Sequence, residues 1–325
     1  MSDLVLPVEL VIASPETTSD AQLLAAFAEF LEIDVANGDA TDDTLRSYAE
    51  SVRLFLAWCV EKGISPVRVT RRDVELYRAF LKESGNAVAT RSRKLSIVRR
   101  FYEAAIKHEL VKENPALRVR GGKDLTPPEE KIKALSRSAL SELFRAIPAT
   151  TFLGKRDRAL VALMAVHGLR RVEVHRLDHE SIEVSGDKAS LKVHGKGNRM
   201  RRIFLRDDTY AALVRYIDGK VEKGWPVTGA LFVSGSNATR GDRLSRRALN
   251  WVVDGYLTPL GLKQDGASCH ALRHTHGTLA VAGGAKVEQL RDEMGHARLE
   301  TTGIYVRAVE RVKNNPANFI DVEVE

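Results

Sequence analysis

The sequence predicts a mainly helical protein of two domains, the second of which also contains a small antiparallel β-sheet. Three observations predict this class. Apolar residues recur at spacings of three and four through most of the 325 residues. Three short segments alternate apolar and polar residues instead, and all three lie in the second half of the chain. A segment with paired glycines and paired prolines separates the two halves.

Four helices account for the first domain, which we place at residues 20–120 after a flexible acidic segment of residues 1–19. Three of these helices follow a threonine that can cap the amino end, namely Thr44, Thr70 and Thr90. No strand pattern interrupts the helical periodicity here. The predicted helices cover residues 21–33, 44–62, 70–81 and 90–108.

The fourth predicted helix is basic and contains no acidic residue between residues 90 and 100. Whichever face of this helix is not buried therefore presents positive charge, which could lie against the phosphates of a nucleic acid. A solvated basic surface is the alternative interpretation. The candidate DNA-binding residues are Arg91, Arg93, Lys94, Arg99 and Arg100.

Residues 121–130 form the predicted linker, because Gly121-Gly122 and Pro127-Pro128 do not continue a helix. The second domain then covers residues 131–312, followed by a tail of residues 313–325. Its predicted strands cover residues 181–184, 189–193 and 201–205, joined by glycine-containing turns. Its predicted helices cover residues 138–147, 156–167, 208–219, 245–257, 270–282, 287–294 and 301–312.

Charge is distributed unevenly along the chain. Residues 1–43 contain ten of the 43 acidic residues and no Lys or Arg, so the rest of the chain carries all 50 basic residues against 33 acidic ones. A basic field of this extent suits a polyanion, and nucleic acid is the favoured partner. A solvated basic surface explains the charge alone equally well.

Composition argues against secreted and membrane proteins. No apolar run approaches the roughly 20 residues needed to span a bilayer. Cys59 and Cys269 are the only cysteines, so the chain cannot build a disulfide framework or a four-cysteine metal site. We therefore expect a cytoplasmic protein without a membrane partner.

Four separated spots combine reactive side chains with turns or helix starts. His270 and Arg273 are three residues apart at a predicted helix start, so both can reach one phosphate beside the helix amino end. His270 and His274 could instead share a zinc ion, but a third ligand and the glutamate typical of helical zinc sites are missing. Two Arg, one Lys, two His and one Tyr suffice to break a phosphodiester without a metal.

The order and spacing of these spots resemble the tyrosine recombinases, also called the phage integrase family, from about residue 20 to residue 310. In that family the corresponding segments supply a first arginine, a hairpin lysine, a histidine with a second arginine, and a histidine nine residues before the tyrosine nucleophile. Arg171 stands where an apolar residue is commoner, and we choose Arg170 because it directly follows Gly168-Leu169. The matching segments are Gly168-Leu169-Arg170 with Glu173, Gly195-Lys196-Gly197-Asn198, His270-Ala271-Leu272-Arg273-His274-Thr275, and Gly295-His296 with Thr301-Thr302-Gly303-Ile304-Tyr305.

The resemblance implies a catalytic set, and it implies a two-domain C-shaped clamp around duplex DNA. Tyr305 would attack a phosphate and form a 3′-phosphotyrosyl link, with His270 as general base and Lys196 as general acid. No metal, cofactor or ATP would be needed, and four protomers would act on two duplexes in integration, excision or resolution. A type IB topoisomerase-like activity and an inert DNA-binding regulator are the alternatives. The implied catalytic residues are Arg170, Lys196, His270, Arg273, His296 and Tyr305.

Overall fold

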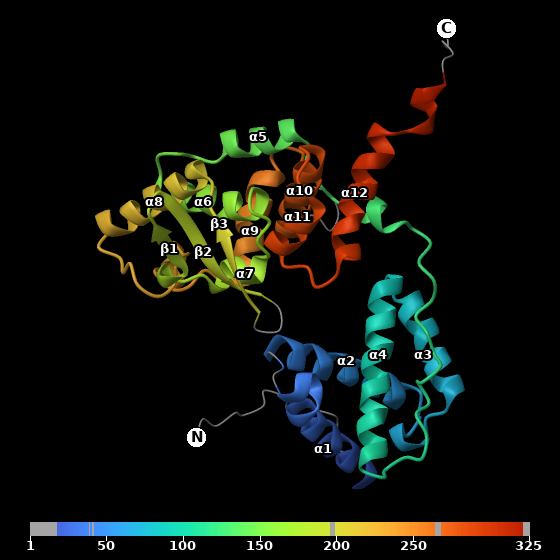
Figure 1. Ribbon diagram of the computed structural model, residues 1–325. Coiled ribbons are helices and arrows are strands. Elements are labelled where there is room, and N and C mark those ends of the chain that lie inside the picture. Colours follow the sequence, from blue (N-terminus) through green and yellow to red (C-terminus); the bar gives the residue numbers. More distant parts are fainter. Residues whose placement is uncertain (1–17, 39, 41, 196–198, 264–267, 321–325) are drawn as a thin grey trace. The chain divides into compact units, whose positions relative to one another are not determined.

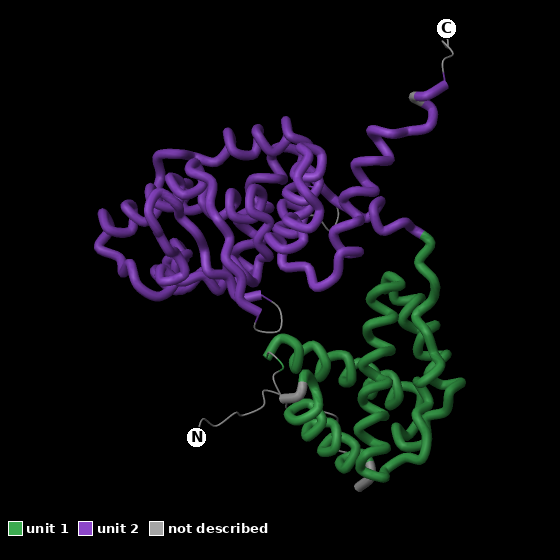
Figure 2. Tube along the Cα trace, in the orientation of Figure 1, with its two compact units in different colours: residues 1–125 green, residues 126–325 purple. Residues whose placement is uncertain are grey.

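The computed structural model describes residues 18–38, 40, 42–195, 199–263 and 268–320. The chain divides into two compact units, Met1–Leu125 and Thr126–Glu325 (Figure 2). Helices dominate both units, and the described strands form one three-stranded antiparallel sheet in the second unit. The predicted fold class is therefore confirmed. None of the described helices is long and apolar enough to cross a membrane.

The first unit is a bundle of helices around an aromatic core (Figure 1). Helix α4 packs against the other three helices. The rings of Phe55 and Tyr77 meet edge to face with their centroids 5.0 Å apart, and those of Phe101 and Tyr102 do so with their centroids 5.1 Å apart. Burial of these large rings removes a large apolar area from water and stabilises the unit. The helices are α1 (Thr18–Ile33), α2 (Asp42–Glu61), α3 (Arg71–Glu83) and α4 (Val88–Lys107).

One of the three predicted helix caps is confirmed, and two are wrong. Thr70 caps α3 and forms a reciprocal capping box with Asp73. Helix α2 begins earlier than predicted, at Asp42, so Thr44 lies inside its first turn. Helix α4 also begins earlier, after Ala87, and has no side-chain cap there. Acidic residues in the first turn of α2 favour its early start, because the amino end of a helix carries partial positive charge.

The segment after α4 folds back onto that helix, which changes two sequence predictions. Gly121 was predicted to open an exposed linker, but it is buried against Ser92. The Arg91 Nε donates a hydrogen bond to the Gly121 carbonyl at 2.9 Å. Arg99 donates to the carbonyls of Ala116 and Val119 at 3.3 and 3.2 Å. These arginines satisfy buried carbonyls of their own unit.

The other three predicted DNA-binding residues of α4 differ in their surroundings. The Lys94 ammonium donates to the side chain of Asn86 at 3.0 Å. Arg100 is exposed and pairs with Glu103 one turn later. Arg93 is exposed and makes no hydrogen bond or ion pair within the described part of the chain. Of the five predicted DNA-binding residues, Arg93 is therefore the one whose charge is free for another molecule.

The close packing of Gly121 predicts that a single methyl group there destabilises the first unit. A Cβ at this position would lie 2.5 Å from the Ser92 backbone nitrogen and 2.8 Å from its Cα. We expect Gly121→Ala to lower the free energy of unfolding by about 1–3 kcal/mol, measured by urea denaturation. Gly255→Ala is the control, because a Cβ there meets nothing within 4 Å. Equal stability of the two variants would contradict the expectation.

In the second unit, helices surround a sheet and a central buried helix, α6 (Figure 1). The strands pair in chain order, with Leu191 of the middle strand opposite Ile182 and Ile203. Leu191 and Ile203 share one face of the sheet and are buried, whereas Phe204 on the opposite face is exposed, so one sheet face joins the core. The strands are β1 (Ile182–Ser185), β2 (Lys188–His194) and β3 (Met200–Phe204).

Most helices of this unit lie within a few residues of their predicted bounds. Helix α7 is the exception, because its six residues are too few to show a helical period in the sequence. Helix α6 begins earlier than predicted because Thr151 caps it. The helices are α5 (Arg137–Ala146), α6 (Phe152–Ala165), α7 (Arg171–Arg176), α8 (Asp207–Glu222), α9 (Arg246–Leu257), α10 (Cys269–Ala282), α11 (Val287–Met294) and α12 (Leu299–Lys313).

Candidate active site

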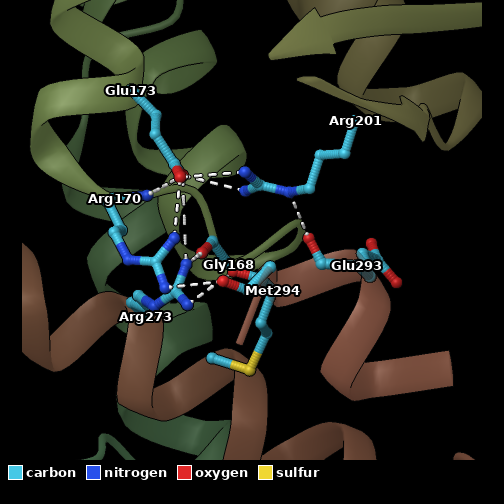
Figure 3. A network of polar contacts seen from close by, with 8 residues as sticks. Gly168, Arg170, Glu173, Arg201, Arg273, Glu293 and Met294 are labelled. Atoms are coloured by element: carbon cyan, nitrogen blue, oxygen red, sulfur yellow. Dashed lines mark hydrogen bonds and ion pairs between the residues drawn. The ribbon is translucent and has the colours of Figure 1, made fainter. Parts of the chain in front are cut away.

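A buried carboxylate, that of Glu173 in α7, lies among three arginines from different parts of the chain (Figure 3). Arg201 of β3 donates one hydrogen bond to each carboxylate oxygen, both at 2.9 Å. Arg170 donates from its side chain and from its backbone N–H, both at 2.8 Å. The Arg273 Nη1 lies 3.9 Å from Oε2 of Glu173. One carboxylate thus holds three guanidinium groups together.

The same three guanidinium groups also bind the carboxyl end of α11 (Figure 3). Arg201 donates to the Glu293 carbonyl at 2.8 Å and Arg273 donates to the Met294 carbonyl at 2.7 Å. Arg170 donates to the Gly295 carbonyl at 3.0 Å. The last carbonyls of a helix have no partner within the helix and carry partial negative charge, so cations suit this position. The end of α11 is thereby fixed to α7, β3 and α10.

Gly295 allows this close approach. It ends α11 in the left-handed conformation, with φ of 63°, which favours glycine. A Cβ at this position would lie 3.1 Å from the Arg201 guanidinium. The chain can therefore turn directly over the arginines and continue to His296.

The charges at this site do not balance. Burial raises the pKa of Glu173, but hydrogen bonds and charge from Arg201 and Arg170 outweigh burial and lower it, so the carboxyl is ionised at neutral pH. Burial, followed by the charge of Arg170, lowers the pKa of Arg273 to about 9, which leaves it cationic at neutral pH. One anion thus faces three partly desolvated cations. Such a site favours a further anion.

Two predicted histidines border these arginines. Desolvation and the charge of Arg273 lower the pKa of His270, which stands in the first turn of α10. Burial and nearby arginine charge lower the pKa of His296 to about 3. The His296 Nδ1 lies 2.9 Å from the Thr302 hydroxyl, which fixes the ring. Both imidazoles are neutral at pH 7 and can accept or donate one hydrogen bond through each nitrogen.

Tyr305 of α12 is buried beside this site, with only 2% of its surface exposed. Its ring stacks on that of His296, with centroids 6.4 Å apart. Its hydroxyl lies 3.1 Å from the Nδ1 of His274. Burial raises the pKa of Tyr305, and the charges of Arg273 and Arg170 oppose this effect. Two of the three arginines around Glu173, Arg273 and Arg170, thus also act electrostatically on the phenol.

The structure brings five of the six sequence-predicted catalytic residues into one region, namely Arg170, His270, Arg273, His296 and Tyr305. Lys196 lies outside the described residues. Its neighbour Gly195 is close to the site, because a Cβ there would lie 3.4 Å from the Arg201 guanidinium.

Arg170 and Arg171 have different surroundings. Arg170 binds Glu173 and the end of α11, and its side chain keeps 27% of its surface exposed. Arg171 is the first residue of α7 and is exposed. Among the described residues, Arg170 is therefore the member of this pair that joins the arginine cluster.

Sequence reasoning missed Arg201 and the contact of His274. Arg201 is one of several arginines at the start of β3, and no motif distinguishes it from Arg199 or Arg202. The sequence indicates His274 as a possible zinc ligand and as part of a segment that matches the family, but assigns it no catalytic role. The described residues contain no group of three or more His, Cys, Asp or Glu side chains that could hold a metal ion. His274 instead contacts Tyr305, which lies 31 positions later in the sequence.

The phage integrase family matches residues 133–311, which is more than half of the chain, and the phage integrase N-terminal SAM-like domain matches residues 24–109. The chain belongs to the phage integrase family. It is similar to the tyrosine recombinase XerC of Bacillus pumilus (strain SAFR-032), with 30% identity over 298 residues, covering 89% of this chain and 92% of the relative. It shares 33% identity over 273 residues with XerC of Rhodospirillum centenum (strain ATCC 51521 / SW), covering 82% of this chain and 77% of the relative.

Solved structures share the fold of this tyrosine recombinase. The XerH site-specific recombinase in its post-cleavage complex with difH has a TM-score of 0.70 at 16% identity, covering 94% of this chain and 89% of that chain. Residues 75–356 of lambda integrase, solved as a dimer bound to a COC′ core site, give a TM-score of 0.63 at 17% identity. The match covers 86% of this chain and 96% of that chain. The predicted enzyme class, a tyrosine site-specific recombinase, is confirmed.

The central position of Glu173 predicts a large effect of its removal. Glu173→Gln leaves three guanidinium groups facing a neutral amide, and we expect it to lower the free energy of unfolding by about 3–5 kcal/mol. Because the folded-state pKa is lowered, the carboxylate stabilises the wild type above the ordinary glutamate pKa of about 4.3. This contribution is lost as the pH falls toward the folded-state pKa. Urea denaturation at several pH values measures both effects.

Glu183→Gln is the matched control. Glu183 forms an exposed ion pair with Arg202 at 2.7 Å, and exposed pairs contribute less than about 1 kcal/mol. Equal losses in the two variants would show that the Glu173 carboxylate is not the anchor of the site. The acid dependence should also shrink in Glu173→Gln and persist in Glu183→Gln.

Proposed function

We propose that this recombinase breaks and rejoins DNA through Tyr305, which forms a 3′-phosphotyrosyl link and releases a 5′ hydroxyl. The observation that carries the proposal is the excess of desolvated guanidinium charge beside the buried Tyr305 phenol. A scissile phosphate between Arg170 and Arg273 would supply the missing negative charge. Its developing transition-state charge would meet donors that are already fixed in place. The bond energy stays in the phosphotyrosyl link, so neither ATP nor a metal is required.

We assign a role to each remaining member of the catalytic set; the role of Lys196 follows from the family resemblance. Arg170 and Arg273 bind the non-bridging phosphate oxygens, and His296 donates a hydrogen bond to the phosphate. His270 lies in the first turn of α10, close enough to Arg273 for the arginine charge to lower its pKa, and would contact the same phosphate. Lys196 protonates the departing 5′ oxygen. Glu173 and Arg201 hold the arginines in position and do not react.

The proposed assembly consists of four protomers on two duplexes, because strand exchange joins two cleaved sites. The XerH and lambda integrase structures, each solved bound to a recombination site, support duplex DNA as the partner. Phe319 and Ile320 of the tail are 76% and 66% exposed. Exposed apolar side chains at the end of a chain suit packing against another copy, which supports a role for the tail in this assembly.

The proposed nucleophile is tested with a nicked suicide duplex that traps the covalent adduct. We expect Tyr305→Phe to form no adduct while it binds the duplex as tightly as wild type, because only a buried hydroxyl is removed. Denaturing gels measure the adduct. An adduct that persists in this variant would assign the nucleophile to another residue.

Arg170→Ala and Arg171→Ala provide a matched pair in the same assay. Arg170→Ala should slow cleavage by at least about 100-fold, as expected for loss of one fixed charge partner of the transition state. Arg171→Ala should cleave within about tenfold of wild type. The reverse order would show that Arg171 enters the site.

A third prediction separates DNA contact from stability in α4. Arg93→Ala should weaken duplex binding and reduce the slope of log affinity against log salt concentration by about one, with unchanged stability. Arg99→Ala should instead lower the free energy of unfolding by about 1–3 kcal/mol, because two carbonyls lose their donor. Filter binding at several salt concentrations and urea denaturation measure the two effects. Unchanged DNA binding by Arg93→Ala would remove α4 from the proposed DNA contact.

A further inference from the structure

The hydroxyl of Tyr305 has a partner outside the catalytic set that the family resemblance implies. The Nδ1 of His274 lies 3.1 Å from this hydroxyl, which makes no other hydrogen bond within the described residues. His270, implied to be the general base, precedes His274 by one turn of α10, and the two rings meet edge to face with centroids 4.5 Å apart. The group positioned to receive the phenolic proton is therefore His274.

Packing restricts the Tyr305 ring on several sides. His296 stacks on the ring, and the His274 ring lies 5.8 Å from it between centroids. Gly277, in the helix turn after His274, leaves room for the phenol, because a Cβ there would lie 2.6 Å from the ring. With 2% of its surface exposed, the side chain has little freedom to turn its hydroxyl away from His274.

His274 is in the right protonation state to accept a proton. Burial, followed by the charges of His270 and Arg273, lowers the pKa of His274 to about 4, so the imidazole is neutral at pH 7. These two groups lie on its own helix, and Tyr305 faces it from α12. A neutral imidazole protonated at Nε2 offers Nδ1 as an acceptor to the phenol.

We infer that His274 is the catalytic residue that takes the proton of Tyr305 during DNA cleavage. This inference rests on the proposed function. As the bond between the Tyr305 oxygen and phosphorus forms, the phenolic proton passes to His274 and the bond between phosphorus and the 5′ oxygen breaks. The departing oxygen receives a proton from Lys196. In rejoining, the 5′ hydroxyl returns its proton to Lys196 as its oxygen bonds to phosphorus, the bond between phosphorus and the Tyr305 oxygen breaks, and His274 returns its proton to the tyrosine.

A bound phosphate would make His274 a better base than it is in the free protein. After burial and His270, the charge of Arg273 lowers the His274 pKa, and a phosphate bound by Arg273 would offset that charge. The phenol also becomes more acidic as its oxygen bonds to phosphorus. Both changes occur along the reaction, so a base with a low pKa in the free protein can still act at neutral pH.

The test compares amide variants in single-turnover cleavage of the nicked suicide duplex. His274→Asn keeps an oxygen acceptor near the position of Nδ1 but cannot take up a proton. We expect it to cleave about 100-fold more slowly than wild type, the scale of general-base catalysis, with unchanged duplex binding and unfolding temperature. His270→Asn is measured in parallel, and His274→Gln is a second variant in case His274→Asn does not fold. Cleavage by a folded His274 amide variant at the wild-type rate would overturn the inference.

A more acidic phenol separates proton transfer from positioning. Trifluorotyrosine at position 305 ionises without a base, so in this background the defect of His274→Asn should shrink to within about threefold. The defect of His270→Asn should not shrink. An undiminished His274→Asn defect would mean that His274 only positions the phenol, and recovery of His270→Asn alone would make His270 the proton acceptor. Failure of the wild type to form any adduct would instead reject the proposed function.

Discussion

The ion cluster around Glu173 is the interaction on which the rest of the second unit depends. Burying a carboxylate costs several kcal/mol unless hydrogen bonds and opposite charge compensate it, and here Arg170 and Arg201 supply four hydrogen bonds. The same carboxylate reduces the mutual repulsion of three nearby guanidinium groups. Four elements that are distant in sequence, α7, β3, α10 and the end of α11, meet at this cluster (Figure 3).

This arrangement explains why the site is rigid and why it favours binding of an anion. Each arginine donates a hydrogen bond to a carbonyl at the end of α11, so its position is fixed before any ligand binds. The neutral carbonyls do not cancel its charge. The site therefore keeps an excess of positive charge in a desolvated setting, which is the property that transition-state stabilisation of a phosphate requires. Tyr305 and His274 lie against the same cluster, so one network positions the charge and the nucleophile.

Arginines serve two different purposes in this protein, and their position in the sequence does not reveal which. Arg91 and Arg99 of α4 bind carbonyls of the segment that returns over the helix, whereas Arg93 of the same helix is exposed. A guanidinium has five donors on a long side chain, so it can satisfy backbone carbonyls that are 17 to 30 positions away in sequence. The number of basic residues thus indicates the sign of the surface charge but not which groups each arginine binds.

Local patterns in the sequence determined the helical class, the sheet and the family. Gly168 before Arg170, the three-residue spacing of His270 and Arg273, and the distance from His296 to Tyr305 are all readable because turn chemistry and helical period act over a few residues. Tertiary structure alone decided that Arg201 binds Glu173 and that His274 contacts Tyr305, at separations of 28 and 31 residues. No local pattern encodes such contacts, because they arise only when buried charges and rings are packed together.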